Sequence, residues 1–270
     1  GSEMDARLQS IKDPDPRMVN KMKESRIKTL NPDEIGYLNI SNFKQDGLVA
    51  NAKTVETILE VTLAKPILPH SKTTFTLDFD GQVPVQIRRS GRNNAEGIEL
   101  SMAQWYPKMA EFDFEGWHAD PYIAREFHGV WGNFDVKITI DKEYVLGGSG
   151  YLQNKNEIGH GYQDAGIKVM YPKNTKALTW HFYAPMVHDF TWAADKNYLH
   201  DVVKGPNGVD LHFLYKNNPN IIDNWKALQP MMIKVMETFN KTVGDYPYKQ
   251  YSFIQGGDGG MEYAMCTLIL

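Results

Sequence analysis

Cysteine is almost absent from this sequence: Cys266 is the one thiol among 270 residues. A single thiol excludes an internal disulfide and a cysteine-based zinc site. Because Cys266 stands in an apolar stretch, we expect it to be a buried structural thiol and not a reactive one.

Three further absences reduce the classes of function that we expect for this chain. The net charge is -4, so there is no basic excess, and we expect no nucleic-acid partner. No apolar run approaches the roughly 18 residues that a membrane-crossing helix needs, which predicts no membrane-spanning segment. No two of the eight histidines are four residues apart. The two-histidine helix face of a zinc peptidase is therefore missing, and we expect no metal site in this chain.

Short segments with strand character fill most of the chain after residue 34, and Gly, Asn, Asp and Pro separate them. Such segments without intervening helices predict a mainly β protein with an antiparallel β-sandwich or saddle. Residues 55–63 alternate in polarity and predict one strand. Asp80-Gly81 predicts the turn of a hairpin between residues 73–79 and 83–87.

Helical patterns are confined to two places. The lead segment, residues 1–33, is polar, and its weak apolar edge predicts a short helix from Asp15 to Ile27. Near the other end, apolar residues recur at three- and four-residue spacing from Trp225 to Val243, which predicts an amphipathic helix. Pro230 is expected to kink that helix or to delay its start.

A glycine-rich stretch follows this helix at residues 255–263. Glycines fill four of its nine positions, and one acid, Glu262, stands between Met261 and Tyr263. Glycine clusters within a strand pattern mark a bulge, or a place where a ligand or a second backbone comes close. An ordinary loop is the alternative interpretation.

Two other clusters have a structural and a functional interpretation. The aromatic residues around Trp105, Trp117, Trp131 and Trp180 are typical of a β-sheet core, and a sugar-binding platform is the alternative. The basic residues of 88–94 are typical of a solvated turn that pairs with nearby acids.

Five short motifs, taken in their order along the chain, resemble the aminopeptidase N family of zinc metallopeptidases. These motifs are Gln104-Trp105-Tyr106-Pro107-Lys108, Phe134-Asp135-Val136, Asp189-Phe190-Thr191-Trp192-Ala193, Gly244-Asp245-Tyr246-Pro247-Tyr248 and Gly259-Gly260-Met261-Glu262-Tyr263. The resemblance covers residues 101–270. It implies a β-saddle domain over residues 34–205 and the start of a thermolysin-like α+β catalytic domain over 206–270.

The resemblance also implies roles for individual residues. In the family, a Gly-x-Met-Glu-Asn segment forms the exopeptidase signature, and its glutamate binds the free α-amine of the substrate. Glu262 matches that glutamate, while Gly259, Gly260 and Met261 match the residues before it. Tyr263 replaces the family's asparagine. Gln104 matches a second polar group near the substrate amine.

The implied function is that of a zinc-dependent aminopeptidase acting on peptides with a free N-terminus. The family's His-Glu-x-x-His zinc helix follows the signature segment, and it is missing from these 270 residues. We therefore expect a truncated fragment of a longer protein, with zinc bound only in the full-length form and no activity of this chain alone. A non-catalytic β-rich binding or scaffolding module related to the family is the alternative.

Overall fold

The structure is a computed structural model that describes residues 19–22, 24–55, 57–119, 129–257 and 259–269. The chain divides into two compact units, residues 1–85 with 106–129 and residues 86–105 with 130–270. The structure is mainly β with antiparallel sheets, as the sequence predicts. The expected boundary between residues 205 and 206 lies inside the second unit, and the family's domain limits stay a prediction.

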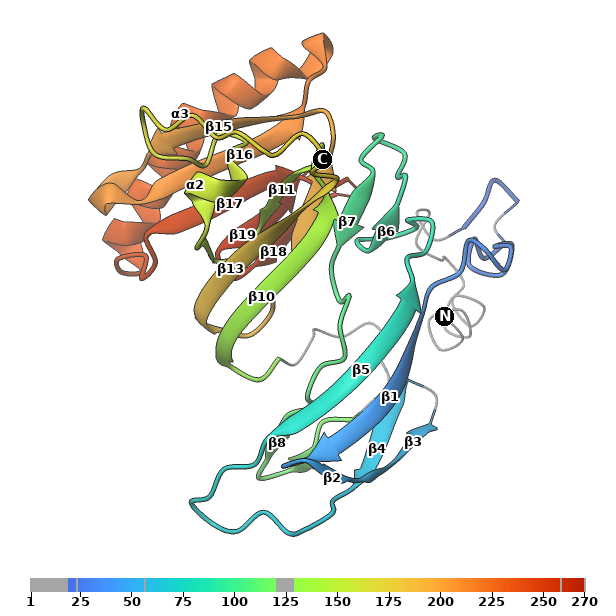
Figure 1. Cartoon of the computed structure of the whole chain (residues 1–270). Helices are drawn as coiled ribbons and strands as arrows, with labels where there is room; N and C mark the ends of the chain where they lie inside the picture. Colours follow the sequence, from blue (N-terminus) through green and yellow to red (C-terminus); the bar gives the residue numbers. More distant parts are fainter. Residues whose placement is uncertain (1–18, 23, 56, 120–128, 258, 270) are drawn as a thin grey trace. The chain divides into compact units, whose positions relative to one another are not determined.

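The first unit consists of antiparallel strand pairs. β1 (Tyr37–Gln45) lies between β2 (Leu48–Val49) and β5 (Phe75–Gln82) in a three-stranded sheet (Figure 1). β3 (Asn51–Val55) pairs with β4 (Ile58–Thr62). The last pair in this unit is a short hairpin of β8 (Phe112–Asp113) and β9 (Gly116–Trp117).

Two predictions for the first unit are wrong. Asp80 and Gly81 lie inside β5, where they pair with Asn39 and Leu38 of β1 instead of forming a turn. A side chain at Gly81 would come within 2.6 Å of the Tyr37 carbonyl oxygen, so this glycine allows two backbones to approach. Residues 55–63 do not form one strand, because Val55 ends β3 and pairs with Ile58 of β4.

The helix predicted from Asp15 to Ile27 is not present in residues 19–22 and 24–27. The remaining positions lie outside the described residues. Val19 and Ser25 form an isolated antiparallel bridge. The side-chain oxygen of Asn20 accepts hydrogen bonds from the backbone nitrogens of Met22 and Glu24, both at 2.9 Å. Such local bonds offer the backbone an alternative to helical bonding.

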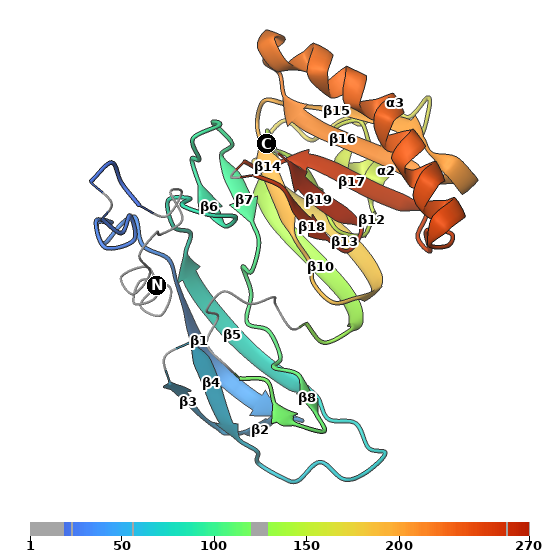
Figure 2. The same cartoon turned by 180° about the vertical axis from the view of Figure 1, so that it is seen from behind.

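The second unit contains three sheets (Figure 2). A four-stranded sheet has the order β11-β14-β7-β6, and a three-stranded sheet has the order β10-β13-β12. The third sheet is mixed, with the order β15-β16-β17-β19-β18. The bounds are β6 Gly91–Arg92, β7 Leu100–Met102, β10 Gly132–Asp141, β11 Val145–Gly148, β12 Tyr151–Leu152, α2 Lys155–Ile158, β13 Ala177–Val187, β14 Trp192–Asp195, β15 Tyr198–Lys204, the 3-10 turn η1 Pro206–Gly208, β16 Asp210–Lys216, α3 Pro219–Thr242, β17 Gln250–Gln255, β18 Met261–Tyr263 and β19 Cys266–Ile269.

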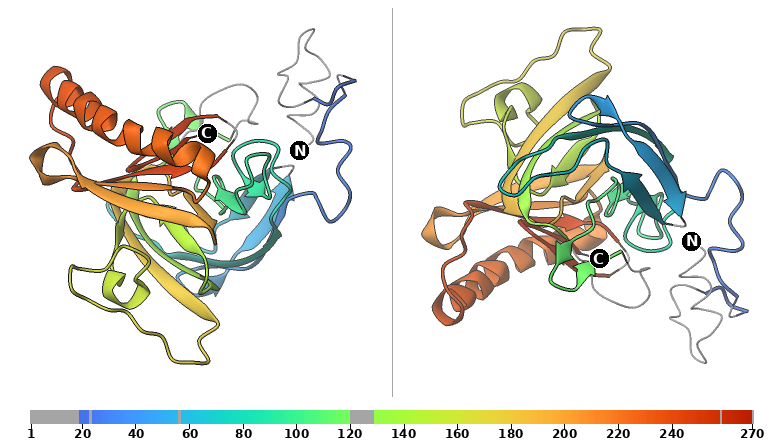
Figure 3. Two further views of the ribbon diagram at one scale, coloured as in Figure 1. Left: turned by 90° about the horizontal axis from the view of Figure 1, so that it is seen from above. Right: turned by 90° about the horizontal axis from the view of Figure 1, so that it is seen from below.

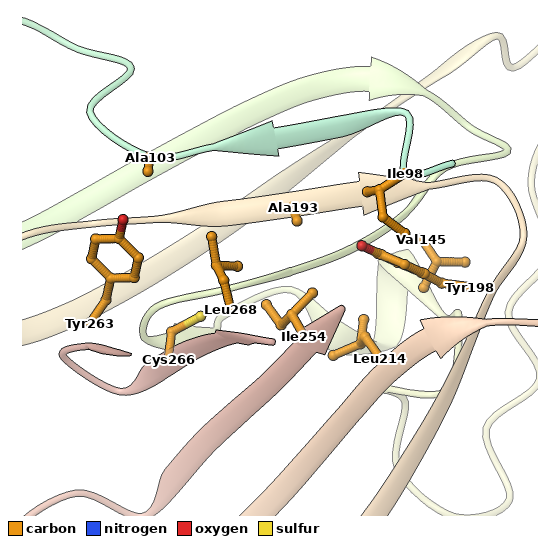
Figure 4. Packing of buried hydrophobic residues seen from close by; sticks show 10 residues of the cluster. All are labelled: Ile98, Ala103, Val145, Ala193, Tyr198, Leu214, Ile254, Tyr263, Cys266 and Leu268. Atoms are coloured by element: carbon orange, nitrogen blue, oxygen red, sulfur yellow. The ribbon is translucent and has the colours of Figure 1, made fainter. Parts of the chain in front are cut away.

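The mixed five-stranded sheet separates two hydrophobic clusters. On one face, Phe213 and Phe253 pack with Trp225 and Met236 of α3, which lies along this face (Figure 3). On the other face, ten buried residues from the mixed sheet, from the four-stranded sheet and from the segments that flank β7 pack together (Figure 4). Cys266 is one of them and is fully buried, and burial raises the pKa of its thiol. The predicted structural thiol is thus confirmed.

The predicted amphipathic helix is confirmed as α3, and it begins six residues earlier, at Pro219. The Asn218 side chain caps it by accepting a hydrogen bond from the Asn220 backbone nitrogen, with proline in the first turn. Pro230 lies inside the helix. Within the described residues, no helix is long and apolar enough to span a membrane.

Candidate functional site

The signature-like segment forms the last strand of the mixed sheet. β18 pairs only with β19 in the order of the described strands, and this pairing is antiparallel. β19, β17 and β16 run parallel to one another. Within the part of the chain that the structure describes, Gly260, Met261 and Glu262 therefore lie along a sheet edge, where backbone groups can pair with another extended chain.

The side chains of β18 alternate between the two faces of the sheet. Tyr263 is buried in the cluster of Figure 4, and Met261 packs against the same cluster. Glu262 is exposed and faces Thr267 across the β18–β19 pair. Facing residues share one side of a sheet, so Glu262 lies on the α3 side.

Electrostatics supports this placement of Glu262. The Tyr251 hydroxyl hydrogen-bonds Thr267, the residue that faces Glu262. Burial raises the pKa of Tyr251 to about 12, and the negative charge of Glu262 contributes to this rise. Glu262 thus adds negative charge beside an exposed sheet edge.

The glycines before β18 have two different roles. The carbonyl oxygen of Gly256 accepts hydrogen bonds from the side-chain nitrogens of Asn94 at 2.9 Å and Gln86 at 3.3 Å. Gly257 has φ +73°, and a Cβ there would lie 2.1 Å from Nδ2 of Asn94. Gly260 is exposed, and the nearest atom to a Cβ there would be 3.9 Å away. A Cβ at Gly256 would lie 3.0 Å from Leu268, so Gly256 and Gly257 both serve close packing, whereas Gly260 leaves the edge open.

This difference predicts opposite outcomes for two alanine variants. Gly257→Ala is expected to lower the free energy of unfolding by about 1–3 kcal/mol, because of its positive φ and the contact with Asn94. Gly260→Ala serves as the matched control and should change it by less than about 1 kcal/mol. Urea denaturation of both variants measures this. Equal losses would contradict the assignment of separate roles.

Gln104, the second predicted site residue, follows β7 in the second unit. Its backbone has φ +54°, which is uncommon for a residue other than glycine. Its side-chain nitrogen donates a hydrogen bond of 2.7 Å to Oδ2 of Asp189. Asp189 is 3% exposed, and its Oδ1 accepts from the backbone nitrogen of Phe190 at 2.8 Å.

In the sequence, Asp189 belongs to one of the five motifs, and nothing there indicates a contact with Gln104. The two residues are 85 positions apart, so no local spacing indicates their contact. The Gln104 region and β18 meet through their neighbours, because Ala103 and Tyr263 belong to the same buried cluster (Figure 4).

The residues near β18 do not fit a catalytic zinc. Among the described residues, one group of three or more potential ligands has its ligand atoms within 4.8 Å of one another, and it lies in the first unit, at Asp113, Glu115 and His118. The histidines of the mixed sheet, His200 and His212, hydrogen-bond each other at 2.9 Å. His212 pairs with Ser252, next to Cys266, so both histidines lie on the face opposite Glu262.

Together, these features define a class: a mixed five-stranded sheet with an antiparallel edge strand and one covering helix, beside antiparallel β-sheets. Solved structures with a similar fold include M1 zinc metallopeptidases. The M1 zinc metallopeptidase from Deinococcus radiodurans superposes with a TM-score of 0.56 at 14% identity, over 88% of this chain and 51% of that one. A mutant M1 zinc metallopeptidase from the same organism, bound to a Tyr-Ser-Ala substrate, gives 0.54 at 14% identity, over 86% of this chain and 50% of that one.

Legionella pneumophila aminopeptidase A, in complex with aspartic acid, superposes with a TM-score of 0.56 at 12% identity, over 86% of this chain and 25% of that one. No family model and no curated protein matches the sequence. The likeness is therefore one of fold. The chain spans about half the length of the D. radiodurans structures and a quarter of the Legionella structure.

Proposed function

We propose that this chain is part of a zinc-dependent aminopeptidase and that it carries the group that binds the substrate's N-terminal amine. One observation carries the proposal: Glu262 is exposed on the last strand of a sheet whose fold resembles the M1 zinc metallopeptidases. The resemblance of Gly259-Gly260-Met261-Glu262 to the exopeptidase signature supports the same role.

The chemistry of the edge suits a peptide with a free N-terminus. A carboxylate holds an ammonium group through charge-assisted hydrogen bonds, which are shorter and stronger than neutral ones. The backbone of an extended peptide can pair with the edge of a sheet, and the missing side chain at Gly260 leaves room for it. In this proposal, Glu262 binds the α-amine and thereby limits cleavage to the first residue.

Gln104 supplies the second polar group in this proposal, and Asp189 orients it. An ionised carboxylate only accepts hydrogen bonds, so its contact with Gln104 fixes which end of the amide carries the nitrogen. Asp189 itself is held by the Phe190 backbone nitrogen. Asp189 is thus proposed as a positioning residue and Gln104 as a substrate contact.

In this proposal the catalytic zinc is held by a part of the full-length protein outside these 270 residues. α3 covers the Glu262 side of the sheet and has a stripe of exposed apolar side chains. This stripe supports the presence of a further part of the protein that packs on that side. Met231, Val235 and Phe239 recur at four-residue spacing and are 57%, 41% and 58% exposed. Contiguous exposed apolar surface of this kind is typical of a face that packs against another part of a protein.

A non-catalytic β-rich binding module is the second candidate. Both candidates fit the described residues beside β18, which include no zinc-ligand group, so only the rest of the full-length sequence separates them. The next hundred or so residues of the full-length sequence discriminate the two candidates. A His-Glu-x-x-His segment there supports the enzyme, and its absence contradicts the enzyme.

The activity test uses this chain and the full-length protein side by side. We expect the chain alone to be inert on aminoacyl substrates, with or without added zinc. The full-length protein should release the first residue from peptides with a free amine and leave N-acetylated peptides intact. Activity of the isolated chain, or equal cleavage of acetylated peptides, would contradict the proposal.

A further inference from the structure

The β8–β9 hairpin of the first unit gathers potential metal ligands on one of its two faces. Phe112 faces Trp117 across the pair, and their rings lie 5.0 Å apart. Asp113 faces Gly116, and the His118 backbone nitrogen donates to the Glu111 carbonyl oxygen at 2.8 Å. Because side chains alternate along each strand, Asp113 and His118 share the face opposite the aromatic pair.

Local bonds preorganise this second face. Oδ1 of Asp113 accepts a hydrogen bond of 2.8 Å from the Glu115 backbone nitrogen, which fixes the carboxyl group at the turn. Its other oxygen, Oδ2, lies 2.9 Å from Nε2 of His118. Gly116 carries no side chain opposite Asp113, and its φ of +100° suits the turn.

The distances fit a small divalent cation. One ligand atom from each of Asp113, Glu115 and His118 lies within 4.8 Å of the other two. A metal with ligand bonds of about 2.0–2.2 Å has neighbouring ligands about 3.0–3.5 Å apart. Small side-chain rotations therefore suffice to place all three around one ion.

We propose that Asp113, Glu115 and His118 form a binding site for a divalent transition-metal ion, with zinc as the best-suited ion. One imidazole nitrogen with two carboxylates is a ligand set for zinc and its neighbours in the first transition row. Calcium prefers six to eight oxygen ligands and does not suit this set. The three side chains come from six consecutive residues, and water completes the coordination.

A matched control exists in the second unit. Nε2 of His181 lies 2.9 Å from Oδ1 of Asp135, the same separation as in the hairpin. Among the described residues, no third ligand residue joins this pair within the 4.8 Å limit. The two sites thus differ in the third ligand, a second carboxylate, on which the proposed metal binding depends.

The experiment is a calorimetric titration of the chelator-treated chain with Zn²⁺. We expect saturation near one equivalent that excess Ca²⁺ does not prevent. His118→Ala and Glu115→Gln should each weaken binding by about tenfold or more, since even indirect ligand partners matter at that scale. Asp113→Asn keeps an oxygen for the Glu115 nitrogen and should weaken binding without unfolding the hairpin. His181→Ala should leave binding unchanged.

Three results would overturn the proposal. These are no saturable Zn²⁺ binding, binding unaffected by His118→Ala, and equal losses in His118→Ala and His181→Ala. Circular dichroism of each variant shows whether the fold is retained. Because this titration measures zinc binding in the first unit and not peptidase activity, its failure leaves the aminopeptidase proposal standing, and the reverse also holds.

Discussion

Replacing Glu262 by glutamine in the full-length protein is expected to lower kcat/KM for peptides with a free N-terminus by about a hundredfold. Removing one partner of a hydrogen-bonded charge pair costs about 2–5 kcal/mol, and each 1.4 kcal/mol is tenfold. Glutamine keeps the size of the side chain and loses its charge, so the change isolates the attraction for the ammonium group. KM and kcat measured with aminoacyl substrates at pH 7 check this.

The control for this variant is an exposed glutamate far from the sheet edge in sequence. Glu60 is exposed on β4 of the first unit, and Glu60→Gln should leave kcat/KM unchanged. Zinc content is measured for both variants. Unchanged kinetics for Glu262→Gln, or a loss of activity that follows a loss of zinc, would refute the amine-binding role.

Acidification from pH 7.5 to 5.5 is expected to destabilise the chain by about 3 kcal/mol through His200 and His212. Nδ1 of His200 must donate to the His160 carbonyl oxygen, 3.0 Å away. Nε2 of His200 therefore accepts, and Nδ1 of His212 donates to it at 2.9 Å. This arrangement requires a neutral His200 ring, because a protonated imidazole has no nitrogen that can accept, and Tyr162 stacks on His212 with ring centroids 5.2 Å apart.

The sign of the pH effect follows from the direction of the pKa shifts. Burial lowers the pKa of His200 to about 4, against the charge of Asp201, which raises it. Burial, with the charges of His200 and Lys204, lowers the pKa of His212 to about 3. The unfolded chain therefore binds protons below about pH 6.5 that the folded chain does not. Stability is present above that pH and is lost as the pH falls towards 4.

Urea denaturation at several pH values measures how the free energy of unfolding changes with pH. The variant His200→Asn/His212→Asn should be less stable at pH 7.5 but should lose less on acidification. Burial also lowers the pKa of His160. The pKa of His118 is raised instead, because of its hydrogen bond to Asp113. His181→Asn is the surface control. An unchanged slope in the double variant would refute the assignment.

The sequence predicts the parts of the fold that periodicity specifies. α3 follows from its apolar spacing. Asp80-Gly81 misleads because a turn signal is local, whereas the partners of these two residues in β1 lie 41 and 43 positions earlier in the chain. Pairing partners of that kind are set by tertiary packing and not by the residues themselves.

The candidate site is predicted only in part for the same reason. The resemblance selects Glu262, but the position of β18 at the end of the strand order needs the whole sheet. The sequence does not separate the roles of glycines in the stretch 255–263, whereas the structure shows that Gly256 and Gly257 pack against Asn94. The partner of Gln104 is Asp189, far along the chain, and no spacing rule connects them.

The contact of Gln86 and Asn94 with Gly256 also bears on how the chain folds. These side chains meet the Gly256 carbonyl across 170 and 162 residues. Contacts this distant along the chain slow folding, because a long loop must close before they form. During synthesis, residues 86–105 therefore cannot form these contacts until the C-terminal strands have been made. The second unit cannot be complete before β19 has left the ribosome, and until then the apolar surface that it buries stays exposed.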